Sequence, residues 1–228
     1  MGRQVKQGMG EFEHVPLPGL PVRPPPQRLS AVFERLALGA TGPISISEIR
    51  SALGDRSFAT LLIFFAVLNL LPLPPGASAV LGLPLVIVAA QMVYGSTTVW
   101  LPKRILDISL TTEQFRGAMA RVVPWLVWLE RWIRPRYWPF WPKQGERIVG
   151  GMALVLSAVV TLPIPLGNWL PAFAVTLLGF ALSERDGVLL AIGALIGVLS
   201  IIIIALVIGS AGALFGFVWS HASMIWPH

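Results

Sequence analysis

The stretch Leu71-Pro72-Leu73-Pro74-Pro75-Gly76-Ala77-Ser78 interrupts a long uncharged apolar run. Ninety-one positions later the chain reads Leu162-Pro163-Ile164-Pro165-Leu166-Gly167-Asn168, so Pro72, Pro74 and Gly76 align with Pro163, Pro165 and Gly167. The same offset aligns Gly54-Asp55-Arg56 with Gly145-Glu146-Arg147. Because two separate motifs agree at one offset, the sequence predicts two copies of one unit. Each copy has a charged start, a short apolar helix, a Pro/Gly break and a second apolar helix.

The composition predicts an all-α integral membrane protein. Hydrophobic residues make up 55% of the chain and charged residues 12%, whereas a soluble domain carries about 25% charged residues. Charged side chains are missing from residues 57–102, 148–183 and 187–228, if histidine is taken as neutral. A helix needs roughly 20 residues to cross about 30 Å of hydrocarbon, so these runs predict about five to seven membrane segments.

The basic residues flank the apolar runs. Seven of the 17 Lys and Arg residues lie between Arg3 and Arg56, and nine between Lys103 and Arg147. This placement favours the positive-inside rule and contact with anionic lipid headgroups, and it contains no nucleic-acid-binding motif. The chain has no cysteine, which excludes disulfides, thiolate metal sites and cysteine nucleophiles.

The chain divides into six predicted regions. They are a disordered Pro-rich tail (1–28), interfacial amphipathic helices (29–54), a first membrane repeat (55–101), a basic, Trp-rich interfacial linker (102–144), a second membrane repeat (145–186) and two C-terminal transmembrane helices (187–228). In the last region, Gly193 and Gly197 form a small-xxx-small pair that predicts a helix-packing face. Residues 209–212 are expected to separate the two transmembrane helices.

Two regions have the pattern of amphipathic helices. In residues 29–54 an apolar stripe starts at Leu29 and Phe33, and Ser45 with Glu48 forms a capping box. These helices are expected on the cytoplasmic membrane interface, with a small soluble subdomain as the alternative. In the linker, one helical face is apolar, and we expect this helix to lie in the headgroup plane, bent at Pro124. That face consists of Phe115, Met119, Val122, Leu126, Leu129 and Ile133.

The linker is also rich in tryptophan. Its aromatic side chains fit an interfacial aromatic belt, and an aromatic cage for a sugar is the alternative. The residues are Trp125, Trp128, Trp132, Trp138 and Trp141.

The first helix of each repeat has about fifteen residues, which covers only about 22 Å. Each repeat is therefore either a re-entrant hairpin followed by a spanning helix, or two kinked crossings. Re-entrant hairpins would invert the two repeats, and two full crossings would make them parallel. The short first helices favour the inverted arrangement, whereas the shared positive charge before each repeat favours the parallel one.

A broken helix in hydrocarbon leaves main-chain N–H and C=O groups without partners, so both breaks are expected to line one polar cavity. Helix N-termini that face this cavity would suit an anionic group. The predicted binding residues are Asn69, Pro72, Pro74, Gly76, Ser78, Gln91, Pro163, Pro165, Gly167 and Asn168.

Charged residues mark the start of each repeat. Asp55 and Arg56 could pair with Arg147 and Glu146 across a pseudo-two-fold axis, or they could act as a gate for protons or substrate. Residues 184–186, Glu-Arg-Asp, are expected to form an exposed turn. The sequence contains no recognised catalytic motif, no metal-ligand cluster and no cofactor motif. A membrane hydrolase or transferase that uses Asp55 or Glu146 as its base is the enzymatic alternative.

The ordered motifs resemble a known family. Gly54-Asp55-Arg56-Ser57-Phe58, the first break, Leu83-Pro84-Leu85 with Gln91-Met92, Trp100-Leu101-Pro102 and the second break together look like the exopolysaccharide-synthesis ExoD family of bacterial inner-membrane proteins. The likeness runs from about residue 30 to 208. It implies a multi-pass protein of the bacterial inner membrane with a role in exopolysaccharide production and, in some members, tolerance of alkaline conditions. It brings no catalytic residues.

The sequence thus predicts a transporter-like protein that moves a small ion or an anionic, lipid-linked species between two broken-helix repeats. The alternative is a non-transporting scaffold or assembly partner of the exopolysaccharide machinery. Expected partners are the lipid bilayer, exopolysaccharide synthesis proteins and a second copy of the chain, with no nucleic acid.

Overall fold

The computed structural model describes residues 28–40, 42–53, 58–71, 77–133, 135–162 and 167–225. Over these residues the protein is almost entirely helical, with two two-residue strands that pair antiparallel. In chain order the elements are α1 (Leu29–Gly39), β1 (Ile44–Ser45), α2 (Ile46–Leu53), α3 (Phe58–Leu68), α4 (Ala77–Tyr94), α5 (Lys103–Leu106), β2 (Ser109–Leu110), α6 (Thr112–Trp132), α7 (Pro142–Thr161), α8 (Trp169–Glu184) and α9 (Gly187–Ile225).

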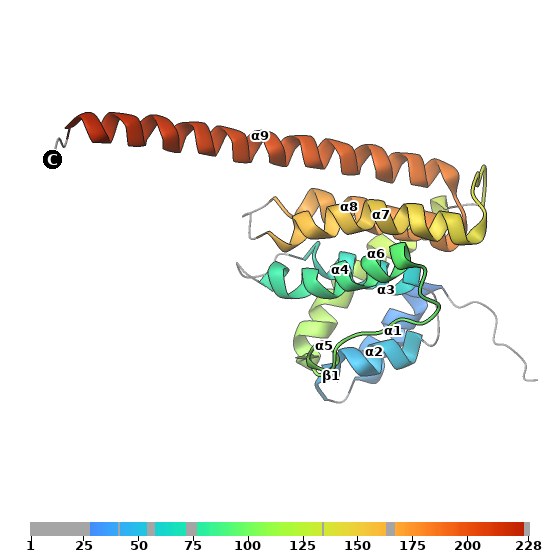
Figure 1. Ribbon diagram of the computed structural model, residues 1–228. Helices are drawn as coiled ribbons and strands as arrows, with labels where there is room; N and C mark the ends of the chain where they lie inside the picture. Colours follow the sequence, from blue (N-terminus) through green and yellow to red (C-terminus); the bar gives the residue numbers. More distant parts are fainter. Residues whose placement is uncertain are drawn as a thin grey trace, which may run out of the picture.

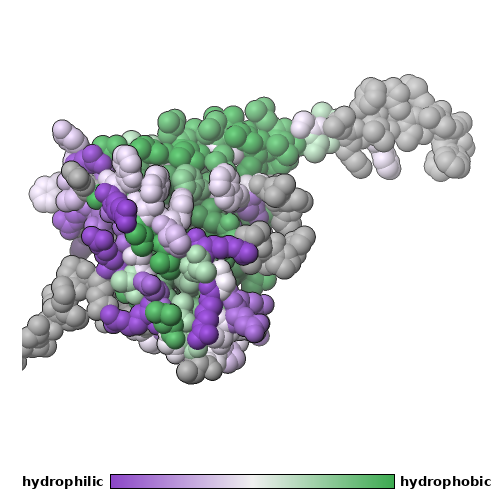
Figure 2. Space-filling model, turned by 180° about the vertical axis from the view of Figure 1, so that it is seen from behind, coloured by the Kyte–Doolittle hydropathy of each residue, from purple (hydrophilic) through white to green (hydrophobic). Residues whose placement is uncertain are grey.

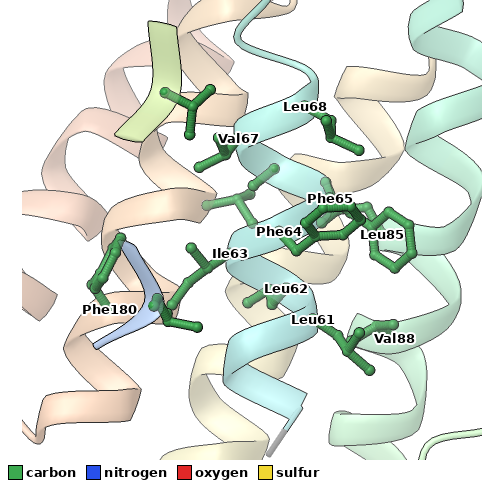
Figure 3. Packing of buried hydrophobic residues seen from close by; sticks show 14 of the residues in the cluster. Leu61, Leu62, Ile63, Phe64, Phe65, Val67, Leu68, Leu85, Val88 and Phe180 are labelled. Carbon is green, nitrogen blue, oxygen red and sulfur yellow. The ribbon is translucent and has the colours of Figure 1, made fainter. Parts of the chain in front are cut away.

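Helix α3 is the centre of the molecule. All eleven of its side chains are buried, and all but that of Thr60 are apolar. Figure 3 shows Phe64 and Phe65 of α3 near Leu85 of α4, while Phe180 of α8 covers another side of the same helix. A helix that is apolar all round is stable only where it is surrounded. Helix α3 meets this requirement because α4 and α8 both pack on it.

Helices α3 and α4 form one hairpin, and α7 and α8 form a second. Helix α4 packs antiparallel on α7, with Gly82 beside Thr161 and Met92 beside Gly150. Helix α8 packs on α3 with Gly179 beside Ile63. Both hairpins therefore turn at the same end of the bundle (Figure 1), so they run parallel, and the inverted arrangement that the short first helices favoured is wrong.

Glycine allows the close approach of α4 and α7. A Cβ atom on Gly150 would lie 2.6 Å from Met92 Cβ and 3.1 Å from the Val93 backbone nitrogen. A Cβ atom on Gly82 would lie 2.8 Å from Thr161 Oγ1 and 3.2 Å from its Cα. Any side chain at either position would push the two helices apart, so the contact between the hairpins depends on these two residues.

Helix α9 is a single helix of 39 residues, so the expected division at residues 209–212 is wrong. Those residues include no proline, and glycine is tolerated inside apolar helices in membranes. Gly193 packs against Leu177 and Leu178 of α8, and Gly197 packs against Leu156 of α7, which confirms the predicted packing face. Beyond Ile204 the described side chains of residues 205–213 are all exposed, and Figure 1 shows the helix extending well past the bundle.

Among the described residues, α9 is the one helix long and apolar enough to cross a membrane. Its stretch Gly187–Ala213 has a mean hydropathy of 3.1, and only 22% of that window is buried. Such low burial is unlike the core helix of a soluble protein, which is mostly covered by its own chain. Three other apolar helices, Phe58–Leu68, Val80–Tyr94 and Trp169–Glu184, are shorter.

The amphipathic helices form a flank of the bundle that is made of α1, α2, α5 and α6. The apolar face of α6 is the predicted one, but it is buried inside the protein and not in headgroups: Phe115 and Leu126 are fully buried. On α1, Phe33 packs against Phe64 of the core, with 5.5 Å between ring centroids. Both apolar stripes therefore pack on protein, because the fold offers them a surface to cover. The placement of these helices at the membrane interface stays a prediction.

Two charged residues of α6 hold the ends of α1. Glu130 accepts hydrogen bonds from the Ser30 backbone N–H (3.1 Å) and hydroxyl (2.7 Å), at the N-terminus of α1. Arg116 donates to the Ala37 and Ala40 carbonyl oxygens, at 3.0 and 2.8 Å, at the C-terminus. Each charge satisfies main-chain groups that the helix leaves open and has the favourable sign for the helix dipole.

Two local predictions have different outcomes. The Ser45–Glu48 capping box is confirmed, since each residue's side chain accepts from the other's backbone N–H at 3.2 Å. The exposed turn is wrong for Asp186, which is 1% exposed. Its carboxylate caps α9 by accepting from the backbone N–H groups of residues 188 and 189, and it lies 3.5 Å from Arg136 Nε.

The surface of the molecule has two unlike sides. Figure 2 shows hydrophobic residues gathered along α9 and hydrophilic residues over the opposite flank. Large apolar side chains of α4 and α7 are also exposed, among them Val80, Leu83 and Val155.

Candidate functional site

The candidate site lies where the two hairpins turn. We call it the elbow site and define it by the described residues Asn69, Ser78, Thr161, Gly167 and Asn168. The Asn168 side-chain nitrogen Nδ2 donates a hydrogen bond to Ser78 Oγ at 2.9 Å, between residues that are 90 positions apart in the chain. Asn168 directly precedes α8, and Ser78 lies in the first turn of α4. The flanks of the two breaks are therefore in direct contact.

Two buried oxygen atoms in the elbow site lack partners. Asn69 and Asn168 are 6% and 8% exposed. The Asn69 side-chain nitrogen donates to the Phe65 carbonyl oxygen at 2.9 Å, so each asparagine uses its NH₂ group within the protein. Within the part of the chain that the structure describes, neither Oδ1 atom has a hydrogen-bond partner. A buried acceptor left open costs about 1–3 kcal/mol, so each of these two atoms needs an explanation, such as an ordered water or a bound group.

The electrostatics of the elbow site come from helix ends. Helices α4 and α8 begin here and present the positive ends of their dipoles, while α3 and α7 end here and present negative ends. The sequence has no Asp, Glu, Lys or Arg in residues 58–102 or 148–183. Among the described residues no group of three or more His, Cys, Asp or Glu could hold a metal ion. The site can therefore donate and accept hydrogen bonds without carrying a net charge.

The structure brings some of the predicted binding residues together and separates another. Asn69, Ser78, Gly167 and Asn168 flank the two turns. Gln91 lies at the other end of α4, thirteen residues or about 20 Å from Ser78. There its side chain exchanges hydrogen bonds with the Trp100 backbone, at 2.6 and 2.7 Å, and fixes the loop after α4.

The remaining predicted residues fall into two groups. Pro72, Pro74, Gly76, Pro163 and Pro165, and also Asp55 and Arg56, lie outside the described residues. Glu146 and Arg147 lie in the first turns of α7, at the end of the bundle opposite the elbow site. There the Arg147 guanidinium packs over Gly95, which has a φ of +82°. The predicted gate residues that can be located are thus far from the site.

An aromatic stack next to the elbow site was not predicted. Trp169 directly follows Asn168, is 59% exposed and stacks on Phe173, with ring centroids 6.2 Å apart and planes at 16°. Phe173 also contacts Trp125 of α6, at 5.3 Å between centroids. The i, i+4 spacing of Trp169 and Phe173 after the break is a signal that could have found this stack.

Comparison with known proteins confirms the resemblance noted above. The profile of the family described as "Exopolysaccharide synthesis, ExoD" matches residues 29–206, a range that includes both hairpins. An uncharacterized protein of Synechocystis sp. is 29% identical over 184 residues, which cover 78% of this chain and 86% of that protein.

The protein ExoD of Rhizobium meliloti is 30% identical over 156 residues, which cover 66% of this chain and 64% of that protein. No solved structure matches the chain. Since the family profile covers well over half of the sequence, this chain belongs to the ExoD family, whose described role is exopolysaccharide synthesis.

Proposed function

We propose that the chain is an inner-membrane protein of exopolysaccharide synthesis, with one crossing helix and two hairpins that enter the bilayer, that moves a small ion or an anionic, lipid-linked species, with the elbow site as its binding site. The observation that carries the proposal is the 2.9 Å hydrogen bond between Asn168 and Ser78, which joins the two breaks beside two open, buried acceptors. Duplicated hairpins whose breaks meet at one polar site are typical of membrane transporters.

The helix lengths support a site inside the bilayer. The apolar stretch Gly187–Ala213 of α9 has 27 residues and spans about 40 Å, which is enough to cross the membrane. Beside it, the bundle covers α9 only from Gly187 to about Ile204, or about 26 Å. If α9 crosses, both hairpins enter beside it from the end that carries Arg147 and Arg185 and turn before the far surface. They would then be parallel re-entrant elements.

The surface supports the same placement. Large exposed apolar residues line α9 and the outer faces of α4 and α7, which suits lipid contact. The exposed charges of the described chain lie on the α1–α6 flank and at the base of the bundle, where headgroups and water would solvate them.

Flux through reconstituted vesicles tests the proposal. The purified protein is inserted into liposomes, and efflux is measured for potassium, for phosphate and for a fluorescent polyprenyl-phosphate sugar. Asn168→Leu keeps the side chain's size but removes the bond to Ser78 and one open acceptor, so we expect at least a tenfold loss of flux for the transported probe. Ser183→Ala, at the exposed base of α8, is the matched control and should retain full flux.

The scaffold alternative predicts a different result. A scaffold would give no flux above empty liposomes for any probe, in wild type or variants, although the protein inserts and is folded. That outcome would refute transport and leave the binding of synthesis proteins as the function to test.

A further inference from the structure

We propose that residues 20–26 of this chain dock into an apolar groove between α1 and α6 and cover it. The groove holds about 470 Å³ and lies on the flank that α1 and α6 form. It shares no residue with the elbow site, so this contact goes beyond the proposed function and does not depend on it. Its walls include Glu34, Ala37 and Leu38 of α1 and Ala120, Val123 and Pro124 of α6.

The groove results from the way α1 and α6 meet. Hydrogen bonds to Glu130 and from Arg116 hold the two ends of α1 against α6. Between these contacts the walls carry Ala37 and Ala120, whose short side chains leave space. Clefts of roughly 300–1,000 Å³ are large enough to bury a ligand, so a groove of this size can hold several side chains.

The walls of the groove favour an occupant with apolar side chains. Leu38 is 76% exposed. Pro124 is also exposed, and Val123 is half-buried. An occupant that covers these three side chains removes apolar surface from water, which is favourable.

The polar atoms of the groove favour a cation on the occupant. The Glu34 carboxylate is exposed, and within the described part of the chain it has no ion-pair partner. Pro124 has no N–H group, so the Ala120 carbonyl oxygen lacks its usual helical hydrogen bond. Arg116, which also lines the groove, already donates to two carbonyl oxygens at the end of α1. The side chain of an arginine on the occupant can donate to the first two groups.

Residues 20–26 have the chemistry that the groove favours. They read Leu-Pro-Val-Arg-Pro-Pro-Pro, with one cation between apolar residues, and they lie outside the described residues. Proline fixes its own φ angle, so a proline-rich segment loses little conformational entropy when it binds. The segment therefore brings Arg23 to Glu34 and apolar side chains to the walls.

The length of the chain allows the segment to reach the groove. Arg28, directly before α1, is extended with φ −59° and ψ 142°, so the chain leaves the helical path there. Glu34 lies six residues later, about 9 Å along the helix. The five residues from Arg28 back to Arg23 span up to about 16 Å when extended, which is enough to fold back to Glu34. Leu20 then lies within reach of Leu38, about 6 Å farther along α1.

Maleimide labelling of single cysteines in isolated membranes tests this contact, since the chain has no cysteine of its own. Leu38→Cys is labelled in the full chain and in a chain that lacks residues 1–27. We expect the deletion to speed labelling by about fivefold or more, and a synthetic peptide of residues 15–28 to slow it again. Ala120→Cys should respond in the same way, which keeps the test valid if Leu38→Cys weakens docking. Arg35→Cys is the matched control, because Arg35 is exposed on α1 but does not line the groove.

Charge reversal tests the ion pair between Arg23 and Glu34. In the full chain, Glu34→Lys should speed labelling of Leu38→Cys as the deletion does. Glu184→Lys, at the exposed end of α8, should leave the rate unchanged. An exposed ion pair adds little to global stability, so the labelling rate is the sensitive measurement.

Each other outcome would overturn the proposal. If labelling of Leu38→Cys and Ala120→Cys does not respond to the deletion, the groove is open or another molecule covers it. An equal increase for Arg35→Cys would show that the deletion disturbs α1 as a whole. A short thiol cross-linker should join Val22→Cys to Ala120→Cys within one chain. Cross-links between two chains alone would show that the groove holds the segment of a second copy.

Discussion

Neighbouring glycines in α7 offer a matched test of how the two hairpins interlock. Gly150 faces α4, where a Cβ atom would lie 2.6 Å from Met92 Cβ and 3.1 Å from the Val93 nitrogen, whereas a Cβ atom on Gly151 would meet nothing within 4 Å. We expect Gly150→Ala to destabilise the protein relative to Gly151→Ala.

The size of the effect follows from two terms. Alanine in place of glycine stabilises a helix interior by about 1 kcal/mol, and this gain is the same at both positions. Overpacking a close contact costs about 1–3 kcal/mol, and it applies at Gly150 alone. The difference between the two variants is therefore the overpacking cost. At about 2–4 °C per kcal/mol for a chain of this size, Gly150→Ala should unfold about 2–12 °C below Gly151→Ala.

Thermal unfolding in detergent, followed by tryptophan fluorescence, measures this difference. Gly151→Ala should unfold at or slightly above the wild-type temperature. If Gly150→Ala is as stable as Gly151→Ala, α4 and α7 do not approach each other closely, and the interlocked hairpins would be refuted.

Three further substitutions test other contacts. Glu130→Ala removes two hydrogen bonds at the N-terminus of α1 and should lower stability by about 1–3 kcal/mol in the same unfolding assay. The control Glu34→Ala, at an exposed position of α1, should change stability little. Equal effects of the two variants would show that the hydrogen bonds from Ser30 to Glu130 do not stabilise α1. Asp186→Ala should destabilise the protein by about 1–3 kcal/mol, because it removes the N-terminal cap of α9. Asp186→Asn keeps an acceptor oxygen and should recover part of this loss. If Asp186→Ala leaves the stability unchanged, the cap does not contribute to it. Gln91→Leu should free the loop at Trp100 and speed its cleavage by chymotrypsin at least several-fold, whereas an unchanged cleavage rate would show that the side chain does not fix this loop.

Local patterns predicted local structure well. Because capping depends on residues three apart, Ser45 and Glu48 could be identified from spacing alone, and the apolar face of α6 followed from the helical period. The repeated Pro/Gly motif located both hairpin turns. Periodicity does not reveal what an apolar face packs against, however, and α6 covers protein where lipid was expected.

Long-range contacts could not be predicted in the same way. The direction of the second hairpin depends on how α4 and α7 meet at Gly82 and Gly150, and no pattern in the sequence states that pairing. Asp186 was placed in an exposed turn because its neighbours are charged, although an Asp before an apolar helix is also a typical N-cap. Gln91 was assigned to the site by its polarity within an apolar run, but its partner is the nearby Trp100 backbone.

Cysteine cross-linking tests most directly whether the two breaks meet. The natural chain has no cysteine, so the pair Ser78→Cys and Asn168→Cys can be introduced without background and treated in native membranes with a short thiol cross-linker. The structure requires efficient cross-linking within one chain, detected by mass spectrometry of the joined peptides, and none between Ser78→Cys and Ser183→Cys, which lie at opposite ends of the bundle. Failure of the Ser78–Asn168 pair to cross-link, while both cysteines react singly with maleimide, would contradict a shared elbow site.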